Sequence, residues 1–204
     1  MNSSYFKLPC AKQKNLINAG YKVFSSNAYK KGSMSFVAGE ATISKSLLFY
    51  YFKNKKEYYL YLFDTATAAL NDLKINSIEQ KKYDLFELVH QEVERRLHIM
   101  QEYPYLLQFI AKAYYETEEE VKQELAAKKN ALIQIEKKDV LALLDYNQFQ
   151  NPADADTLFD LILFVAEGCM RGNEDLNEAK IRGILPQFQR MMTSLKCHYY
   201  KQGG

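Results

Sequence analysis

The chain has 204 residues, of which 48% are hydrophobic and 25% are charged. This length is enough to bury a hydrophobic core, and the composition is typical of a globular protein rather than a disordered or fibrous one. The longest strongly apolar run, residues 158–166, contains Asp160 and is too short to span a bilayer. Lys7, Lys12 and Lys14 precede any apolar run, so no signal peptide is expected. We therefore expect a cytoplasmic protein with no membrane partner.

Charge is distributed unevenly along the chain. Residues 1–60 contain ten lysines, no arginine and only two acidic residues, Glu40 and Glu57, which gives a net charge of +8. The rest of the chain has 17 basic and 23 acidic residues, a net charge of −6. A basic segment on an acidic remainder is typical of a protein that binds a polyanion at one end. A solvated basic face is the alternative, and charge alone does not separate the two.

Cysteine and histidine spacing argues against catalysis and metal binding. The three cysteines are scattered and lack C-x-x-C spacing, which is typical of free thiols in a reducing compartment. His90 and His98 are eight residues apart, whereas a helical metal pair needs four. His198 adjoins Cys197, but adjacent side chains diverge on a helix. We expect no catalytic residue, no metal and no cofactor, and hence a protein that is not an enzyme.

Helical periodicity covers almost the whole chain, and sustained strand alternation is not seen. Only eight glycines and four prolines interrupt it, which favours long helices with short connections. The predicted fold class is all-α, with about nine helices. The expected helices cover, approximately, residues 9–24, 33–39, 44–52, 55–73, 85–102, 104–115, 118–145, 152–171 and 174–200. Pro186 is expected to kink the last of these or to restart it.

The first three helices have the plan of a helix-turn-helix. The expected inner residues are Met34, Val37, Ile43, Leu48 and Phe52. The third helix then exposes hydrogen-bond donors and flat aromatic rings, namely Lys45, Ser46, Phe49 and Tyr50. Hydroxyls and lysines suit phosphates and base edges, and rings suit sugars and thymine methyls. Residues 1–54 are therefore predicted to form a DNA-binding domain.

The start of the fourth helix supports this interpretation. Lys53, Lys55 and Lys56 crowd a helix N-terminus, where the helix dipole disfavours cations. Their presence favours an anionic partner, because helix N-termini also bind phosphates through backbone N–H groups. Asn54 followed by Glu57 resembles a capping box, which fixes where this helix begins.

Residues 16–58 resemble, without a gap, the DNA-binding domain of the TetR (tetracycline-repressor) family. The matching residues are, in order, Val37-Ala38, Ile43-Ser44-Lys45, Leu48-Phe49-Tyr50-Tyr51-Phe52 and Lys55-Lys56-Glu57. Three residues depart from the family pattern. Thr42 and Ala28 stand where the pattern has glycine, and Gly32 stands where it has the threonine that opens the second helix. A non-glycine residue in the turn costs about 1 kcal/mol if its φ is positive.

The resemblance implies how individual side chains contact DNA. It places on phosphates Ser33, Phe49, Tyr51 and Lys55, and at or near base edges Lys45, Ser46, Leu47 and Tyr50. For Phe49 and Tyr51 the alternative is that their rings simply cover the core. The resemblance also implies a dimer that binds a palindromic double-stranded operator.

Residues 55–204 are implied by the same resemblance to form a helical ligand-binding and dimerisation domain. The sequence supports this, since residues 158–170 are apolar nearly all round and such a helix must bury two faces. The last expected helix carries a second apolar stripe, which begins at Ile181. These two helices from each protomer would together make a four-helix interface. The predicted interface residues are Leu158, Ile162, Val165, Ile184, Phe188 and Met192. A large monomeric core is the alternative.

A zone rich in aromatic residues and methionine is predicted to line a ligand pocket. Its residues are Met100, Tyr103, Phe109, Tyr114 and Phe159, although the same stripe could be plain core. The leading hypothesis is a homodimeric repressor released from its operator by a small-molecule effector. The alternative is a helix-turn-helix architectural or division-linked DNA-binding protein whose C-terminal domain binds a protein partner. An enzyme that uses the aromatic cavity is a third, weaker hypothesis.

Overall fold

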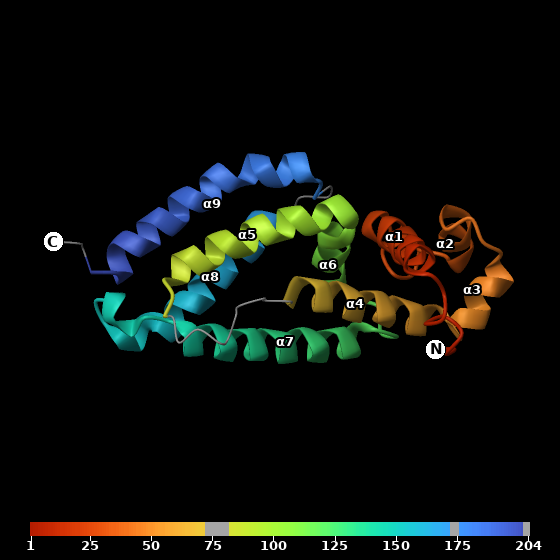
Figure 1. The fold of residues 1–204 in the computed structure, drawn as a ribbon, viewed down its shortest axis with the longest axis horizontal. Coiled ribbons are helices and arrows are strands. Elements are labelled where there is room, and N and C mark those ends of the chain that lie inside the picture. The colour runs from red at the N-terminus through yellow and green to blue at the C-terminus, as the bar shows by residue number, and fades with distance from the viewer. Residues whose placement is uncertain (72–81, 172–175, 202–204) are drawn as a thin grey trace. The chain divides into compact units, whose positions relative to one another are not determined.

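The structure, a computed structural model, describes residues 1–71, 82–171 and 176–201 (Figure 1). Within these ranges every regular element is helical, which confirms the all-α class. The helices are α1 (Cys10–Ser26), α2 (Met34–Glu40), α3 (Lys45–Tyr51), α4 (Lys55–Asn71), α5 (Leu85–Glu102), α6 (Leu106–Tyr114), α7 (Lys122–Leu143), α8 (Ala155–Met170) and α9 (Glu178–Tyr199). None of the helices in these ranges combines the length and the hydropathy needed to cross a bilayer.

Several predicted boundaries needed correction. The helix expected from residue 118 begins at Lys122, and the one expected from residue 104 begins at Leu106. Asn151 caps a short 3-10 turn through Ala153 N–H, so that α8 starts only at Ala155. The helix α9 passes through Pro186 as one bowed element and does not restart there. The predicted positions Leu73 and Glu174 lie outside the described residues.

The chain divides into two compact units, Met1–Asp72 with Ile99–Asn130, and Leu73–His98 with Ala131–Gly204. They are called unit 1 and unit 2 below. Unit 1 contains the helix-turn-helix and also α6, which packs against both α1 and α4. In unit 2, α8 packs against α9. The predicted functional division into residues 1–54 and 55–204 stays a prediction.

The core of the helix-turn-helix agrees with the sequence pattern. Met34, Val37, Leu48 and Phe52 are buried as predicted, whereas Ile43 is only half-buried. Ile43 nevertheless closes the turn, because its backbone N–H donates to the carbonyl of residue 38 at 3.0 Å. The two short helices are thus fixed to each other by apolar packing and by a backbone hydrogen bond.

Close approach between α1 and α4 completes the scaffold of unit 1. The Tyr58 hydroxyl donates to the Leu16 carbonyl at 2.6 Å, and the Tyr21 hydroxyl donates to the Leu62 carbonyl at 3.3 Å. A Cβ at Gly20 would lie 2.4 Å from the Tyr58 hydroxyl, so a larger residue there would displace the Tyr58 side chain from this bond. Burial raises the pKa of Tyr58 above its ordinary value, which keeps its hydroxyl a donor.

The turn between α2 and α3 carries backbone strain. Thr42 has a φ of 54° and is the single non-glycine residue with positive φ in the described part of the chain. This left-handed conformation is unfavourable for a β-branched residue, by about 1–2 kcal/mol. The sequence predicted this cost from the absence of glycine in the turn.

Replacing Thr42 by glycine should therefore stabilise the protein. We expect Thr42→Gly to raise the free energy of unfolding by about 0.5–1 kcal/mol, because relief of strain exceeds the extra backbone entropy lost by glycine. Urea unfolding at one fixed protein concentration measures the change. The matched control is Thr117→Gly, at an exposed loop threonine that is not among the residues with positive φ, and it should lower stability. Equal effects of the two substitutions would show that Thr42 is not strained.

Candidate nucleic-acid interface

Side-chain caps define where α2 and α3 begin. The Ser33 hydroxyl accepts from Phe36 N–H and the Ser44 hydroxyl accepts from Leu47 N–H, both at 3.1 Å. A capping hydroxyl uses an oxygen lone pair for this bond and keeps its own proton for another acceptor. Ser33, a predicted phosphate contact, can therefore cap α2 and still donate to an anion.

The outer face of α3 presents the predicted DNA-contacting side chains to solvent. The exposed residues on it are Lys45, Ser46, Leu47, Phe49 and Tyr50. The Lys45 ammonium lies 6.0 Å from the centroid of the Phe49 ring, within the range of a cation–π contact. Six of the eight predicted contacts thus lie on one helix, and five of them are exposed there, with donors beside apolar rings.

Tyr51 lies differently from its neighbours on α3. Only 8% of its surface is exposed, and its ring centroid is 6.0 Å from that of Tyr5. This placement agrees with the alternative that the Tyr51 ring covers the core, and its phosphate contact stays a prediction. On α2, Phe36 is 62% exposed, and the sequence reasoning did not single it out. The signal was available, because Met34 and Val37 face inward and helical periodicity then turns Phe36 outward.

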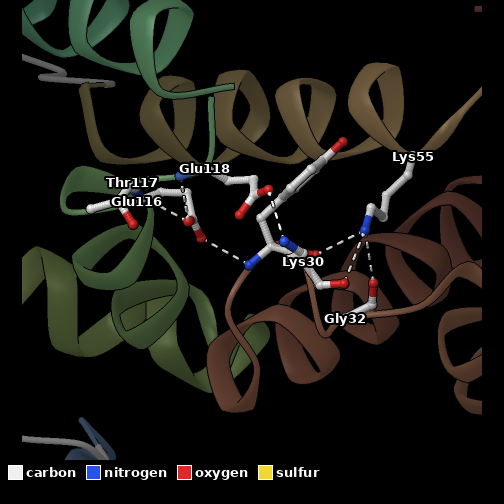
Figure 2. A network of polar contacts seen from close by, with 7 residues as sticks. Lys30, Gly32, Lys55, Glu116, Thr117 and Glu118 are labelled. Atoms are coloured by element: carbon white, nitrogen blue, oxygen red, sulfur yellow. Dashed lines mark hydrogen bonds and ion pairs between the residues drawn. The ribbon is translucent and has the colours of Figure 1, made fainter. Parts of the chain in front are cut away.

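Lys55 is held by the loop between α1 and α2 (Figure 2). Its ammonium donates to the backbone carbonyls of Tyr29 at 3.0 Å and of Lys30 and Gly32 at 3.4 Å. It also lies 4.3 Å from the centroid of the Tyr29 ring. A Cβ at Gly32 would come within 2.5 Å of the Phe24 ring, so glycine lets the loop pack closely. Lys55, predicted to contact a phosphate, therefore also holds the loop that leads into α2.

The same loop is held from a second side by Glu116, which follows α6 (Figure 2). One carboxylate oxygen accepts from Tyr29 N–H at 2.8 Å, and the other accepts from the N–H groups of Thr117 and Glu118 at 2.9 and 3.1 Å. The Lys30 ammonium lies 3.8 Å from Glu118. Burial raises the pKa of Tyr29, and neighbouring glutamates add to the rise. Sequence reasoning missed this contact, which joins residues 87 positions apart.

The basic charge of residues 1–60 is partly paired within unit 1. Lys56 forms an ion pair with Glu124 at 2.7 Å, and Lys22 forms one with Glu40 at the same distance. These pairs are exposed and therefore weak, so that phosphates can replace their acidic partners. The exposed Lys45 on α3 adds charge at the helix that is predicted to face DNA.

The predicted pocket residues fall in both units. In unit 1, Met100 and Phe109 are buried, whereas Tyr103 and Tyr114 are half-buried. The Phe109 ring packs 5.1 Å from Tyr21 and 5.3 Å from Tyr59, between α1 and α4. In unit 2, Phe159 packs against the core there. Phe109 thus acts as a core residue, and the pocket stays a prediction.

The predicted dimer residues all lie on α8 and α9 in unit 2. Four of them belong to the core of the single chain, namely Leu158, Ile162, Phe188 and Met192, and two are half-buried, namely Val165 and Ile184. The large apolar residues that the same helices expose are Phe164, at 66%, and Met191, at 38%. The apolar stripe therefore has an inner row, which fills the core, and an outer row that the sequence did not distinguish from it.

Comparison with known proteins places this geometry in context. Residues 16–62 match the family model described as bacterial regulatory proteins, tetR family. Comparison with curated protein sequences gives no match.

Solved structures agree over nearly the whole chain. A TetR family transcriptional regulator from Chloroflexus aurantiacus has 20% identity and a TM-score of 0.63, covering 98% of this chain and 99% of that one. A transcriptional regulator from Cytophaga hutchinsonii has 19% identity and a TM-score of 0.61, with coverages of 91% and 97%. MexZ, a key repressor responsible for antibiotic resistance in Pseudomonas aeruginosa, has 15% identity and a TM-score of 0.60, with coverages of 92% and 96%. At these identities the likeness concerns the fold.

Replacing Lys55 tests its structural contacts. We expect Lys55→Ala to lower the free energy of unfolding by about 1–3 kcal/mol, because three carbonyls lose a charged donor and a ring loses its cation. The control is Lys53→Ala, an exposed lysine two residues away that should leave stability unchanged. Urea unfolding of both variants measures the difference. Equal stability of the two variants would mean that the loop does not depend on Lys55.

Proposed function

We propose that this chain, which belongs to the TetR family of bacterial regulatory proteins, is a repressor that binds a palindromic operator as a homodimer and is released by a small-molecule effector. Its role as a DNA-binding transcriptional regulator follows from the family, which is one of regulators and not of enzymes. The observation that carries the finer proposal is the exposed face of α3, where Lys45, Ser46 and Tyr50 lie together. A regulator of bacterial transcription would act in the cytoplasm.

DNA binding by this face rests on shape and charge. The helix α3 projects donors and aromatic rings, which suit base edges, sugars and thymine methyls in the major groove. The lysines of residues 1–60 supply attraction to the phosphates, which dominates affinity and depends on salt. The caps Ser33 and Ser44 begin the two short helices and supply hydroxyls at their N-termini.

Dimerisation is supported by the apolar surface of α8 and α9. A half-site reader needs a second copy to bind a palindrome. Phe164 and Met191 are exposed although large and apolar, and apolar surface of this kind is typical of a protein interface. We therefore assign the outer row of α8 and α9 to the contact between two copies and the inner row to the core of each chain.

The predicted pocket residues Phe109 and Tyr114 lie on α6. Release by an effector bound there requires a link between α6 and the DNA-reading helices. Two such links exist within unit 1. The Phe109 ring packs between Tyr21 of α1 and Tyr59 of α4, and Glu116 binds the backbone of Tyr29. A shift of α6 would thus move the loop that precedes Ser33. A coupling of about 1–3 kcal/mol would change DNA affinity roughly 5- to 150-fold. Thermal-shift screening of a metabolite library identifies compounds that bind.

Binding to DNA should depend steeply on salt. If six to ten phosphates are contacted, affinity should fall by about 10³- to 10⁵-fold between about 50 and 200 mM salt. Fluorescence anisotropy with a duplex that the protein selects from a randomised pool measures this. Lys45→Ala should weaken binding, whereas Lys180→Ala, an exposed lysine on α9, should not. An affinity that does not change with salt would contradict DNA binding by the lysine-rich segment.

The proposed dimer can be disrupted without damaging the core. We expect Phe164→Asp to yield a folded monomer, because the side chain is exposed in the single chain and a charge at an apolar interface is costly. Phe36→Asp is the control, since Phe36 has similar exposure on α2. Light scattering at micromolar concentration gives the oligomeric state. A wild-type monomer, or a Phe164→Asp dimer as stable as the wild type, would contradict the assignment.

A further inference from the structure

The residues that precede α1 pack against the end of α3. Tyr5 is completely buried, with its ring centroid 4.9 Å from that of Phe52 and 5.3 Å from that of Tyr61. The Tyr61 hydroxyl donates to the Tyr5 hydroxyl at 3.1 Å. Residues 2–8, called the N-terminal segment below, are therefore anchored in the aromatic core beneath the DNA-facing helix. They lie before the part of the chain that matches the family model.

Backbone contacts fix this segment to α3 itself. Asn2 N–H donates at 2.9 Å to the carbonyl of Tyr51, the last residue of α3. Carbonyls at a helix C-terminus have no partner within the helix, so this bond satisfies one of them. The Asn2 side chain also accepts from Ser4 N–H at 2.9 Å, which holds Ser4 in a tight turn. Ser4 is thus located by contacts on both sides, from Asn2 and from the buried ring of Tyr5.

The Ser4 hydroxyl lies 3.1 Å from the hydroxyl of Tyr50. The Tyr50 side chain is 55% exposed and projects from the face of α3 that is proposed to enter the groove. In a hydroxyl pair one oxygen donates its proton and the other accepts it, so the bond to Ser4 restricts the directions in which the Tyr50 hydroxyl can donate or accept a second bond. It also restricts the rotation of an exposed ring before DNA arrives, which reduces the entropy lost on binding.

We propose that Ser4 is a positioning residue for DNA recognition, which sets the orientation of the Tyr50 hydroxyl and so sharpens the choice between operator and unrelated sequence. The inference rests on the proposed function, since it assumes that Tyr50 faces bases. A hydroxyl of fixed orientation offers either a donor or an acceptor to a base edge in the major groove. Ser4 acts through Tyr50 and through no contact of its own with a base.

The test compares four variants on two duplexes. The probes are a duplex that the wild-type protein selects from a randomised pool and a scrambled version of it. We expect Ser4→Ala to reduce the ratio of the two affinities by about 3- to 10-fold per half-site, the effect of one lost neutral hydrogen bond. Ser3→Ala, at the exposed neighbouring serine, should leave the ratio unchanged. In a Tyr50→Phe background, Ser4→Ala should cause no further loss, because the partner hydroxyl is already absent.

Each other outcome overturns the proposal. If Ser4→Ala gives the same ratio as Ser3→Ala, or if its full loss persists in the Tyr50→Phe background, action through Tyr50 is excluded. A lowered melting temperature with equal losses on both duplexes would show a purely structural role. Failure of the wild-type protein to select any duplex would overturn the proposed function as well. This outcome is distinguished from failure of the Ser4 proposal alone, because it is seen in the wild-type protein without any substitution.

Discussion

The ring of Phe109 is the contact on which the DNA-reading part of the molecule depends. It is completely buried between Tyr21 of α1 and Tyr59 of α4. The helices α2 and α3 have seven residues each, which is too short for a helix to be stable by itself in water. They must therefore be held by packing, and the scaffold that holds them includes α6 as well as α1 and α4. The DNA-reading helices and α6 form one core.

A shared core makes the position of α2 sensitive to α6. The helix α6 is followed directly by Tyr115 and Glu116, and the Glu116 carboxylate binds the backbone of Tyr29. Lys55 of α4 binds carbonyls of the same loop, which leads into the cap of α2 at Ser33. The loop is thus fixed by a carboxylate on one side and an ammonium on the other. A change that favours another position of α6 must break the bond from Tyr29 to Glu116 or move the loop with α6 and so strain its bonds to Lys55.

Local patterns were sufficient to predict the helix-turn-helix. The inward positions of Met34, Val37 and Leu48 follow from helical periodicity, and the strain at Thr42 follows from the missing turn glycine. The proline at 186 was harder to interpret, because a helix can bend around a missing hydrogen bond without ending.

Contacts between distant residues could not be predicted in this way. The bond between Tyr29 and Glu116 spans 87 positions, and nothing in the periodicity of either segment indicates the other. Lys55 was expected to contact phosphate from its place at a helix start, yet the tertiary fold surrounds it with carbonyls. On α8 the apolar residues surround the helix, so the pattern could not separate the inner residue Ile162 from the exposed Phe164.

Amide hydrogen exchange at Tyr29 most directly tests whether α6 positions the DNA-reading helices through Glu116. In the wild-type protein the Tyr29 N–H is bonded to the Glu116 carboxylate and should exchange slowly. We expect Glu116→Ala to speed this exchange by at least about tenfold and to spread the effect along the loop to Ser33, because a charge-assisted bond contributes about 1.5–3 kcal/mol. The control Glu119→Ala, at an exposed neighbour, should leave the loop protected. Unchanged exchange at Tyr29 in Glu116→Ala would show that the loop is held independently of α6.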